Sequence, residues 1–119
     1  MRVAVLGASP DPDKYANKAI KSLLKHGHEV IPINPQYEEI EGLTVAKSIG
    51  DVKGPIETLT LYMNPTRLSA IVEDIIAAKP KRIIMNPGAE SATLARRAKE
   101  SGIECIEACT LVLLSIAKF

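Results

Sequence analysis

The chain has 119 residues, of which 46% are hydrophobic and 3% aromatic, and 15 basic against 14 acidic side chains leave a formal net charge of +1. This length fits one domain, residues 1–119, with an aliphatic core that buries roughly two-thirds of the unfolded surface without a disulfide or a metal. The balanced charge and the four aromatic residues argue against nucleic-acid binding, because they provide neither a basic patch nor a base-stacking surface.

The first predicted unit is a strand, a helix and a second strand. Arg2–Leu6 is a short β-branched run typical of a buried strand. It is too short for a signal peptide or a membrane span, so we expect a cytoplasmic protein without membrane contact. Helical spacing of apolar residues predicts a helix over Tyr15–Lys25, ended by Gly27, and Glu29–Ile33 predicts the next strand. Such a unit requires parallel strands joined by a right-handed crossover.

The middle of the chain has weaker patterns. Between residues 36 and 56 only a short strand near Thr44-Val45 and a helical turn near Ser48–Asp51 are predicted. Thr58–Tyr62 then predicts a third clear strand, because it is short, rich in β-strand formers and bounded by turn residues.

The second half of the chain continues the alternation of helices and strands. Apolar residues predict one helix from Leu68 to Ile76, followed by a strand at Arg82–Met85, a helix at Thr93–Glu100 and a strand at Glu104–Glu107. Leu111–Ile116 is apolar on nearly all sides, so we expect a terminal helix that is packed down. This pattern predicts an α/β fold: a single Rossmann-like, doubly wound parallel sheet with helices on both faces.

Three predicted strands end in Asn-Pro, at Asn34-Pro35, Asn64-Pro65 and Asn86-Pro87. Parallel strands bring these turns to the carboxyl edge of the sheet, where open α/β folds bind ligands at the reversal of strand order. Each Asn-Pro pair alone is more typical of a plain turn in which Asn caps the next helix and Pro takes its first position. Together with Gly7, the three pairs favour a ligand cleft.

The first turn, Gly7–Asp13, joins the first strand to its helix, where a doubly wound fold places a phosphate near free main-chain amides. It is not the usual dinucleotide motif, because Ser9 and Pro12 replace its second and third glycines. Asn34 takes the place at which NAD enzymes carry an acidic residue, and no arginine for an NADP phosphate is close by. The sequence therefore predicts a nucleotide cleft that lacks the usual features of both nicotinamide sites.

Six segments together carry a family resemblance: Gly7-Ala8-Ser9, Asn17–Ile20, Gly27–Pro35, Ile40–Gly42, Gly88–Glu90 and Gly102–Glu104. With these segments the chain resembles, over nearly its whole length, the small stand-alone CoA-binding domain family. That family is similar in fold to the CoA-binding domain of the succinyl-CoA synthetase α-subunit. The resemblance implies a Rossmann-like fold and a small-molecule nucleotide ligand, coenzyme A.

The resemblance also implies which residues form the site. Those implied for the CoA diphosphate are Gly7, Ala8, Ser9 and Pro10, with Lys14 or Lys18 supplying charge. Those implied for the adenosine end are Asn34 and Pro35. Those implied for the cleft wall and the pantetheine path are Tyr62, Met63, Asn64, Asn86, Pro87 and Gly88.

The chain departs from this family at two places. Many relatives carry arginines just after the strand that ends at Tyr62, where this chain has Met63-Asn64. Relatives also carry Trp and Gln before the glycine that corresponds to Gly88, where this chain has Asn86-Pro87. The missing arginines remove charge that would meet the CoA phosphates, and Arg67 replaces only part of it.

The sequence favours binding over catalysis. Cys109 has no histidine partner nearby in the sequence, and the turn around Ser9 lacks the second glycine of a nucleophile elbow. We therefore predict binding of coenzyme A or an acyl-CoA without a reaction. Two alternatives stay open: a nucleotide-sensing regulator that acts through a protein partner and forms a homo-oligomer, and an NAD(P)-binding redox protein, which Asn34 disfavours.

Overall fold

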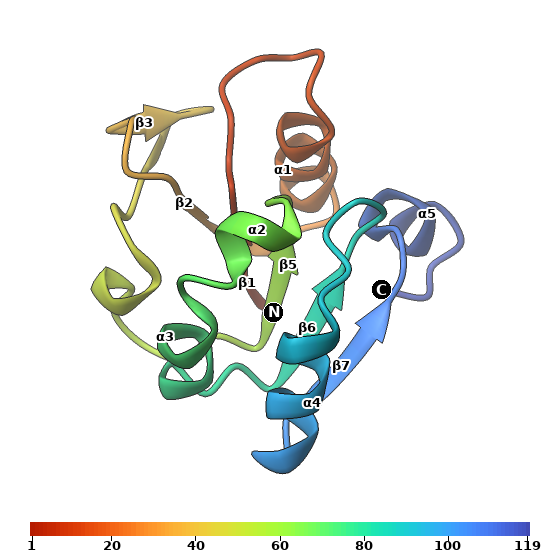
Figure 1. The fold of residues 1–119 in the computed structure, drawn as a ribbon. Helices are drawn as coiled ribbons and strands as arrows, with labels where there is room; N and C mark the ends of the chain where they lie inside the picture. The colour runs from red at the N-terminus through yellow and green to blue at the C-terminus, as the bar shows by residue number, and fades with distance from the viewer.

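The computed structural model describes residues 1–119 and is built on a five-stranded parallel sheet in the order β2-β1-β5-β6-β7. The strands are β1 (Arg2–Leu6), β2 (Glu29–Ile33), β5 (Thr58–Leu61), β6 (Arg82–Met85) and β7 (Glu104–Glu107). Helices α1 (Tyr15–Lys25) and α5 (Thr110–Ser115) cover one face, and α2 (Pro65–Leu68), α3 (Val72–Ala77) and α4 (Ala92–Glu100) cover the other (Figure 1). The predicted doubly wound α/β fold is confirmed.

Alternating side chains of β1 build a core on each face of the sheet. Val3 and Val5 are fully buried on the side of α1 and α5, where they join a cluster that includes Ile20, Leu23 and Leu114. Ala4 and Leu6 point to the other side, into a larger cluster with residues of α2, α3 and α4. Because both faces of β1 are buried, its sequence is a nearly continuous run of apolar residues.

The order of the strands reverses at β1. The chain leaves β1 through α1 to β2 on one side, whereas β5 pairs with β1 on the other side and continues to β6 and β7. The loops after β1 and β5 consequently turn to opposite faces of the sheet, and a crevice opens between them at the carboxyl edge.

The segment between β2 and β5 forms a strap beside β2. It contains a small antiparallel hairpin, β3 (Glu39–Ile40) and β4 (Leu43–Thr44), and a 3₁₀ turn, η1 (Ile49–Asp51). Ala46 pairs with the end of β2, since its N–H donates to the Pro32 carbonyl at 2.9 Å and its carbonyl accepts from the Asn34 N–H at 2.9 Å. The short strand predicted near Thr44-Val45 is one arm of this hairpin.

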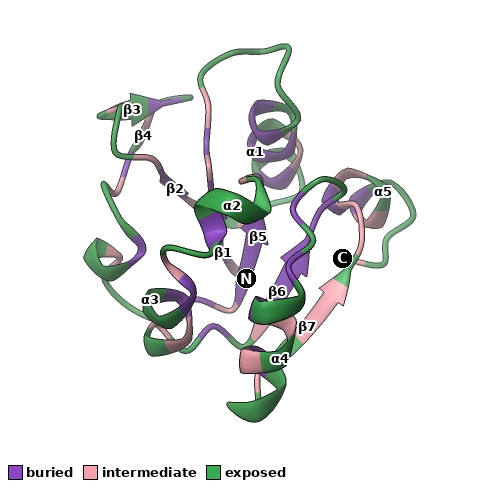
Figure 2. Ribbon diagram, in the orientation of Figure 1, coloured by how far each residue is buried: buried purple, intermediate pink, exposed green.

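One sequence expectation for the helices is wrong. The single helix predicted over residues 68–76 is two helices, α2 and α3, joined by a tighter turn in which the Ile71 N–H donates to the Leu68 carbonyl at 3.0 Å. The terminal helix α5 is packed down as predicted, because Leu114 joins the core cluster of β1 and α1, but its outer side is uncovered and Val112 is 53% exposed. Figure 2 shows both buried and exposed parts along α5. Only Thr110 and Leu114 of this helix are buried. No helix is long and apolar enough to cross a membrane.

Candidate functional site

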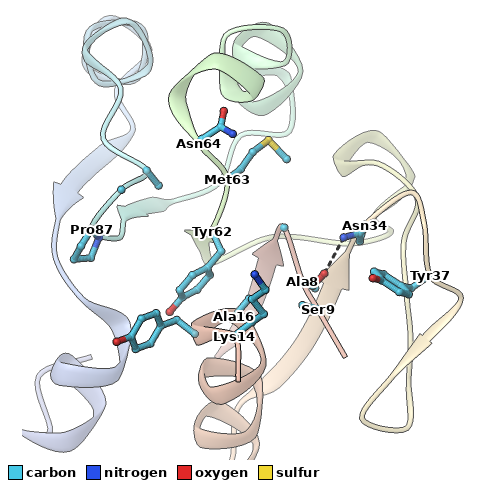
Figure 3. A pocket seen from close by; sticks show the side chains of 14 residues that line it. Ala8, Ser9, Lys14, Ala16, Asn34, Tyr37, Tyr62, Met63, Asn64 and Pro87 are labelled. Carbon is cyan, nitrogen blue, oxygen red and sulfur yellow. Dashed lines mark hydrogen bonds between the residues drawn. The ribbon is translucent and has the colours of Figure 1, made fainter. Parts of the chain in front are cut away.

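The loops that follow β1, β2, β5 and β6 surround a cavity of about 370 Å³ at the carboxyl edge of the sheet (Figure 3). Most of the predicted site residues line this cavity: Gly7, Ala8, Ser9, Lys14, Asn34, Tyr62, Met63, Asn64, Pro87 and Gly88. Four residues that the sequence did not single out join them: Tyr15, Ala16, Tyr37 and Ala89. The strand order alone thus brings residues from both halves of the chain to one place.

The turn after β1 is held against the ends of its two neighbouring strands. The N–H groups of Gly7 and Ala8 both donate to the Ile33 carbonyl, at 3.1 and 3.2 Å, and the Asn34 amide donates to the Ala8 carbonyl at 2.8 Å (Figure 3). Gly7 has a φ of +87°, and a Cβ added there would lie 2.9 Å from the carbonyl carbon of Tyr62. Only glycine fits this close approach of two backbones.

The first turn of α1 faces the same cavity with unused donors. The main-chain N–H groups of Tyr15 and Ala16 have no hydrogen-bond partner within the chain, and Lys14 at the N-cap position provides no side-chain cap. The Lys14 side chain lies beside this helix start (Figure 3). Free amides, the positive end of an 11-residue helix and a lysine ammonium together favour an anion at this point.

Asn17 of α1 holds the turn after β1 in place from the protein interior. Its side chain is fully buried, and its Nδ2 donates to the Ser9 carbonyl at 3.0 Å and to Oε2 of Glu41 at 3.1 Å. Glu41 lies at the tip of the β3–β4 hairpin, with a φ of +52°. Asn17 therefore ties the turn after β1 to the strap, although its own Oδ1 has no partner.

The Asn86 side chain lies in the protein interior and not on the wall of the cavity. It is 3% exposed, and its Nδ2 donates to Oγ1 of Thr60 at 2.7 Å and to the Leu61 carbonyl at 2.8 Å. Its Oδ1 accepts from the Thr110 N–H at 2.9 Å, while the two threonine hydroxyls lie 2.8 Å apart. This buried network joins β5, β6 and the start of α5, so the amide predicted to border the pantetheine path is fully used inside the protein.

Tyr62 lines the cavity with a hydroxyl that is buried and lacks a hydrogen-bond partner. Burial raises the pKa of Tyr62 to about 12, and the nearby hydroxyls of Thr110 and Thr60 offset this only in part. The phenol is therefore neutral at physiological pH, and it is a donor without an acceptor in the ligand-free protein.

A second cavity, of about 420 Å³, lies on the other side of the turn after β1. It shares Gly7, Asn34, Tyr62 and Met63 with the first cavity. Of the remaining predicted residues, Pro35 lines this second cavity. Arg67, which the sequence connects with phosphate binding, also lines this cavity, whereas no sequence motif points to its other polar residues: Lys47, Ser48 and Asp74.

Three predicted site residues line neither of the two cavities: Asn86, whose amide is used inside the protein, Pro10 and Lys18. Pro10 is exposed at the outer part of the turn, and the Lys18 ammonium lies 5.4 Å from the ring centroid of Tyr15. The cysteines and histidines are also outside both cavities, and no group of three side chains is arranged to hold a metal ion.

Comparison with known proteins identifies the family. Residues 1–115 match the CoA-binding domain family. The chain belongs to the CoA-binding domain family. A solved structure described only as an uncharacterized protein is 39% identical, with a TM-score of 0.92, and the match covers 99% of this chain and 97% of that one.

Curated relatives are longer than the part that matches. The uncharacterized protein YneT of Bacillus subtilis (strain 168) is 29% identical over 75 residues, which are 63% of this chain and 56% of that protein. The acetate–CoA ligase (ADP-forming) II subunit alpha of Pyrococcus furiosus is 36% identical over 56 residues. These residues are 46% of this chain but 12% of the ligase subunit, so the matched segment is a small part of that protein.

Proposed function

We propose that the chain binds coenzyme A or an acyl-CoA at the crevice between β1 and β5. The observation that carries this proposal is the pair of cavities that meet at Gly7, with the uncapped start of α1 beside the meeting point. Coenzyme A has a matching layout, because a diphosphate lies between an adenosine end and a pantetheine arm. The family membership supports the same ligand.

In this arrangement the diphosphate lies against the turn after β1. The free N–H groups of Tyr15 and Ala16 donate to its oxygens, and Lys14 supplies the nearest cationic side chain of the first cavity. The pantetheine arm runs through the first cavity past Pro87 and Gly88. The adenosine end occupies the second cavity, beyond Asn34.

We further propose that binding occurs without a reaction on the thioester. Ser9 is the one hydroxyl of the turn on the cavity, and its Oγ already accepts from the Asp11 N–H at 3.1 Å. No histidine lies at either cavity to act as a general base. Burial, followed by the nearby Glu107, raises the pKa of Cys105, which makes that thiol a poor nucleophile.

Thermal unfolding of the purified protein with separate ligands tests the proposal. Coenzyme A and acetyl-CoA should each raise the melting temperature, because a ligand at 100 times its Kd adds about 2.7 kcal/mol to the stability of the folded state. NAD, NADP and ATP should raise it less. A rise with a nicotinamide cofactor and none with coenzyme A would show that the proposed ligand is wrong.

A matched pair of lysine variants locates the site. Lys14→Ala should weaken coenzyme A binding several-fold in isothermal titration calorimetry, since it removes a charge beside the diphosphate. Lys99→Ala removes another exposed lysine, on α4 and outside both cavities, and should leave the affinity unchanged. Release of a free thiol from acetyl-CoA during incubation would contradict the absence of catalysis.

A further inference from the structure

The second cavity changes in chemical character along its length. At its near end it shares Gly7, Asn34, Tyr62 and Met63 with the first cavity. At its far end it shares Ile49, Gly50 and Asp74 with a smaller hollow between η1 and α3. The two cationic residues of its wall, Lys47 and Arg67, come from the strap and from α2.

These two cations are not neutralised by the protein. The three ion pairs of the chain involve Arg2 and Arg97 as their basic partners, not Lys47 or Arg67. The Lys47 ammonium has one contact, a hydrogen bond to the Tyr37 carbonyl at 3.2 Å, and the Arg67 guanidinium has no hydrogen bond. Both side chains are exposed, so they are available to an anion that enters the cavity.

Ile49, Ile71 and Asp74 give the second cavity an apolar and acidic part that suits an aromatic base rather than a phosphate. Ile49 and Ile71 come from η1 and from the turn between α2 and α3, and they provide two apolar surfaces in the same cavity. Asp74 lies at the far end, and its carboxylate forms no ion pair. A flat aromatic base fits between apolar surfaces, and an exocyclic amino group is the complement of a free carboxylate.

We infer, on the basis of the proposed coenzyme A binding, that Lys47 and Arg67 hold the 3′-phosphate on the ribose of the ligand. Leading away from the diphosphate, coenzyme A presents a phosphorylated ribose and then adenine. The cavity leads away from Gly7 with two cations and Ile71 on its wall and with Ile49 and Asp74 at the far end. These two residues therefore set the preference for coenzyme A over an otherwise identical molecule without that phosphate.

Direct comparison of coenzyme A with dephospho-CoA by isothermal titration calorimetry tests this inference. Charge-assisted contacts to a phosphate, weakened here by solvent exposure, should make coenzyme A bind roughly tenfold more tightly. Arg67→Ala and Lys47→Ala should each lower the affinity for coenzyme A several-fold and leave that for dephospho-CoA unchanged. Arg67→Lys should keep part of the preference, and Lys99→Ala on α4 should keep all of it.

The possible results separate the inference from the proposal on which it rests. If both ligands bind equally tightly, the 3′-phosphate contact is wrong while coenzyme A binding itself stands. If coenzyme A is preferred but neither Lys47→Ala nor Arg67→Ala changes the preference, the assignment to these residues is wrong. If neither ligand binds, the proposed function fails together with the inference. The melting temperature of each ligand-free variant verifies that it is folded.

Discussion

Replacement of Gly7 by alanine should destabilise the protein by about 2–5 kcal/mol, from two separable causes. A φ of +87° is unfavourable for a residue with a Cβ, at about 1–2 kcal/mol. The added methyl group would also lie 2.9 Å from the carbonyl carbon of Tyr62 and closer still to its oxygen, and forced repacking of this kind costs about 1–3 kcal/mol. Both strands at the crevice would have to shift.

Gly27 provides a matched control for this substitution. Its φ of +82° is nearly the same, but no atom lies within 4 Å of the position that a Cβ would take. Gly27→Ala should therefore cost only about 1–2 kcal/mol. Urea unfolding of both variants without ligand, followed by circular dichroism, gives the two free energies of unfolding. Equal losses for the two variants would refute the argument that the approach of Tyr62 requires glycine at residue 7.

Three further predictions concern the buried polar groups near the cavity. Asn86→Ala should lower the free energy of unfolding in urea by about 3 kcal/mol, because it leaves the Thr110 N–H without its acceptor. Asn64→Ala at the exposed cap of α2 should lower it by only about 1 kcal/mol. Similar losses for the two variants would contradict the role of the buried network. In an ultraviolet titration, Tyr62 should ionise near pH 12. Because the folded state keeps this proton above pH 10, stability should fall between about pH 10 and 12, and Tyr62→Phe should remove that loss. Asn17→Ala should speed amide hydrogen exchange in the β3–β4 hairpin, and unchanged exchange would show that the tie to Glu41 is unimportant.

The fold could be predicted because the strands of a doubly wound sheet are buried on both faces. Arg2–Leu6 and Arg82–Met85 have the boundaries that the sequence predicts, since their apolar runs end at a glycine and at an Asn-Pro pair. The break between α2 and α3 was not predictable from periodicity, because a turn with i to i+3 hydrogen bonds keeps the apolar residues on the same face. The Ser69 hydroxyl, which donates to the Thr66 carbonyl at 2.6 Å, accompanies this break.

The candidate site was predictable where a motif lies directly after a strand, and less so elsewhere. Gly7 and Asn34 follow β1 and β2, so their meeting at the carboxyl edge follows from parallel pairing alone. Lys47 and Asp74 are solvent-exposed residues on separate elements, and only the path of the strap brings them to one cavity. The Asn-Pro motif correctly placed Asn86 at the carboxyl edge of the sheet, but it could not show where the side chain points. Hydrogen bonds with Thr60 and Thr110 hold its amide in the interior.

The parallel sheet also determines when the crevice forms as the chain folds. No two neighbouring strands of the five-stranded sheet are joined by a hairpin, and β1 obtains its second neighbour only from β5, with Arg2 bonded to Glu57, 55 residues away. Pairing over such separations is slow, and until it occurs the edge of β1 is open to other chains. The crevice requires the loops after both strands, so the step that ends this aggregation-prone stage is also the step that creates the binding site.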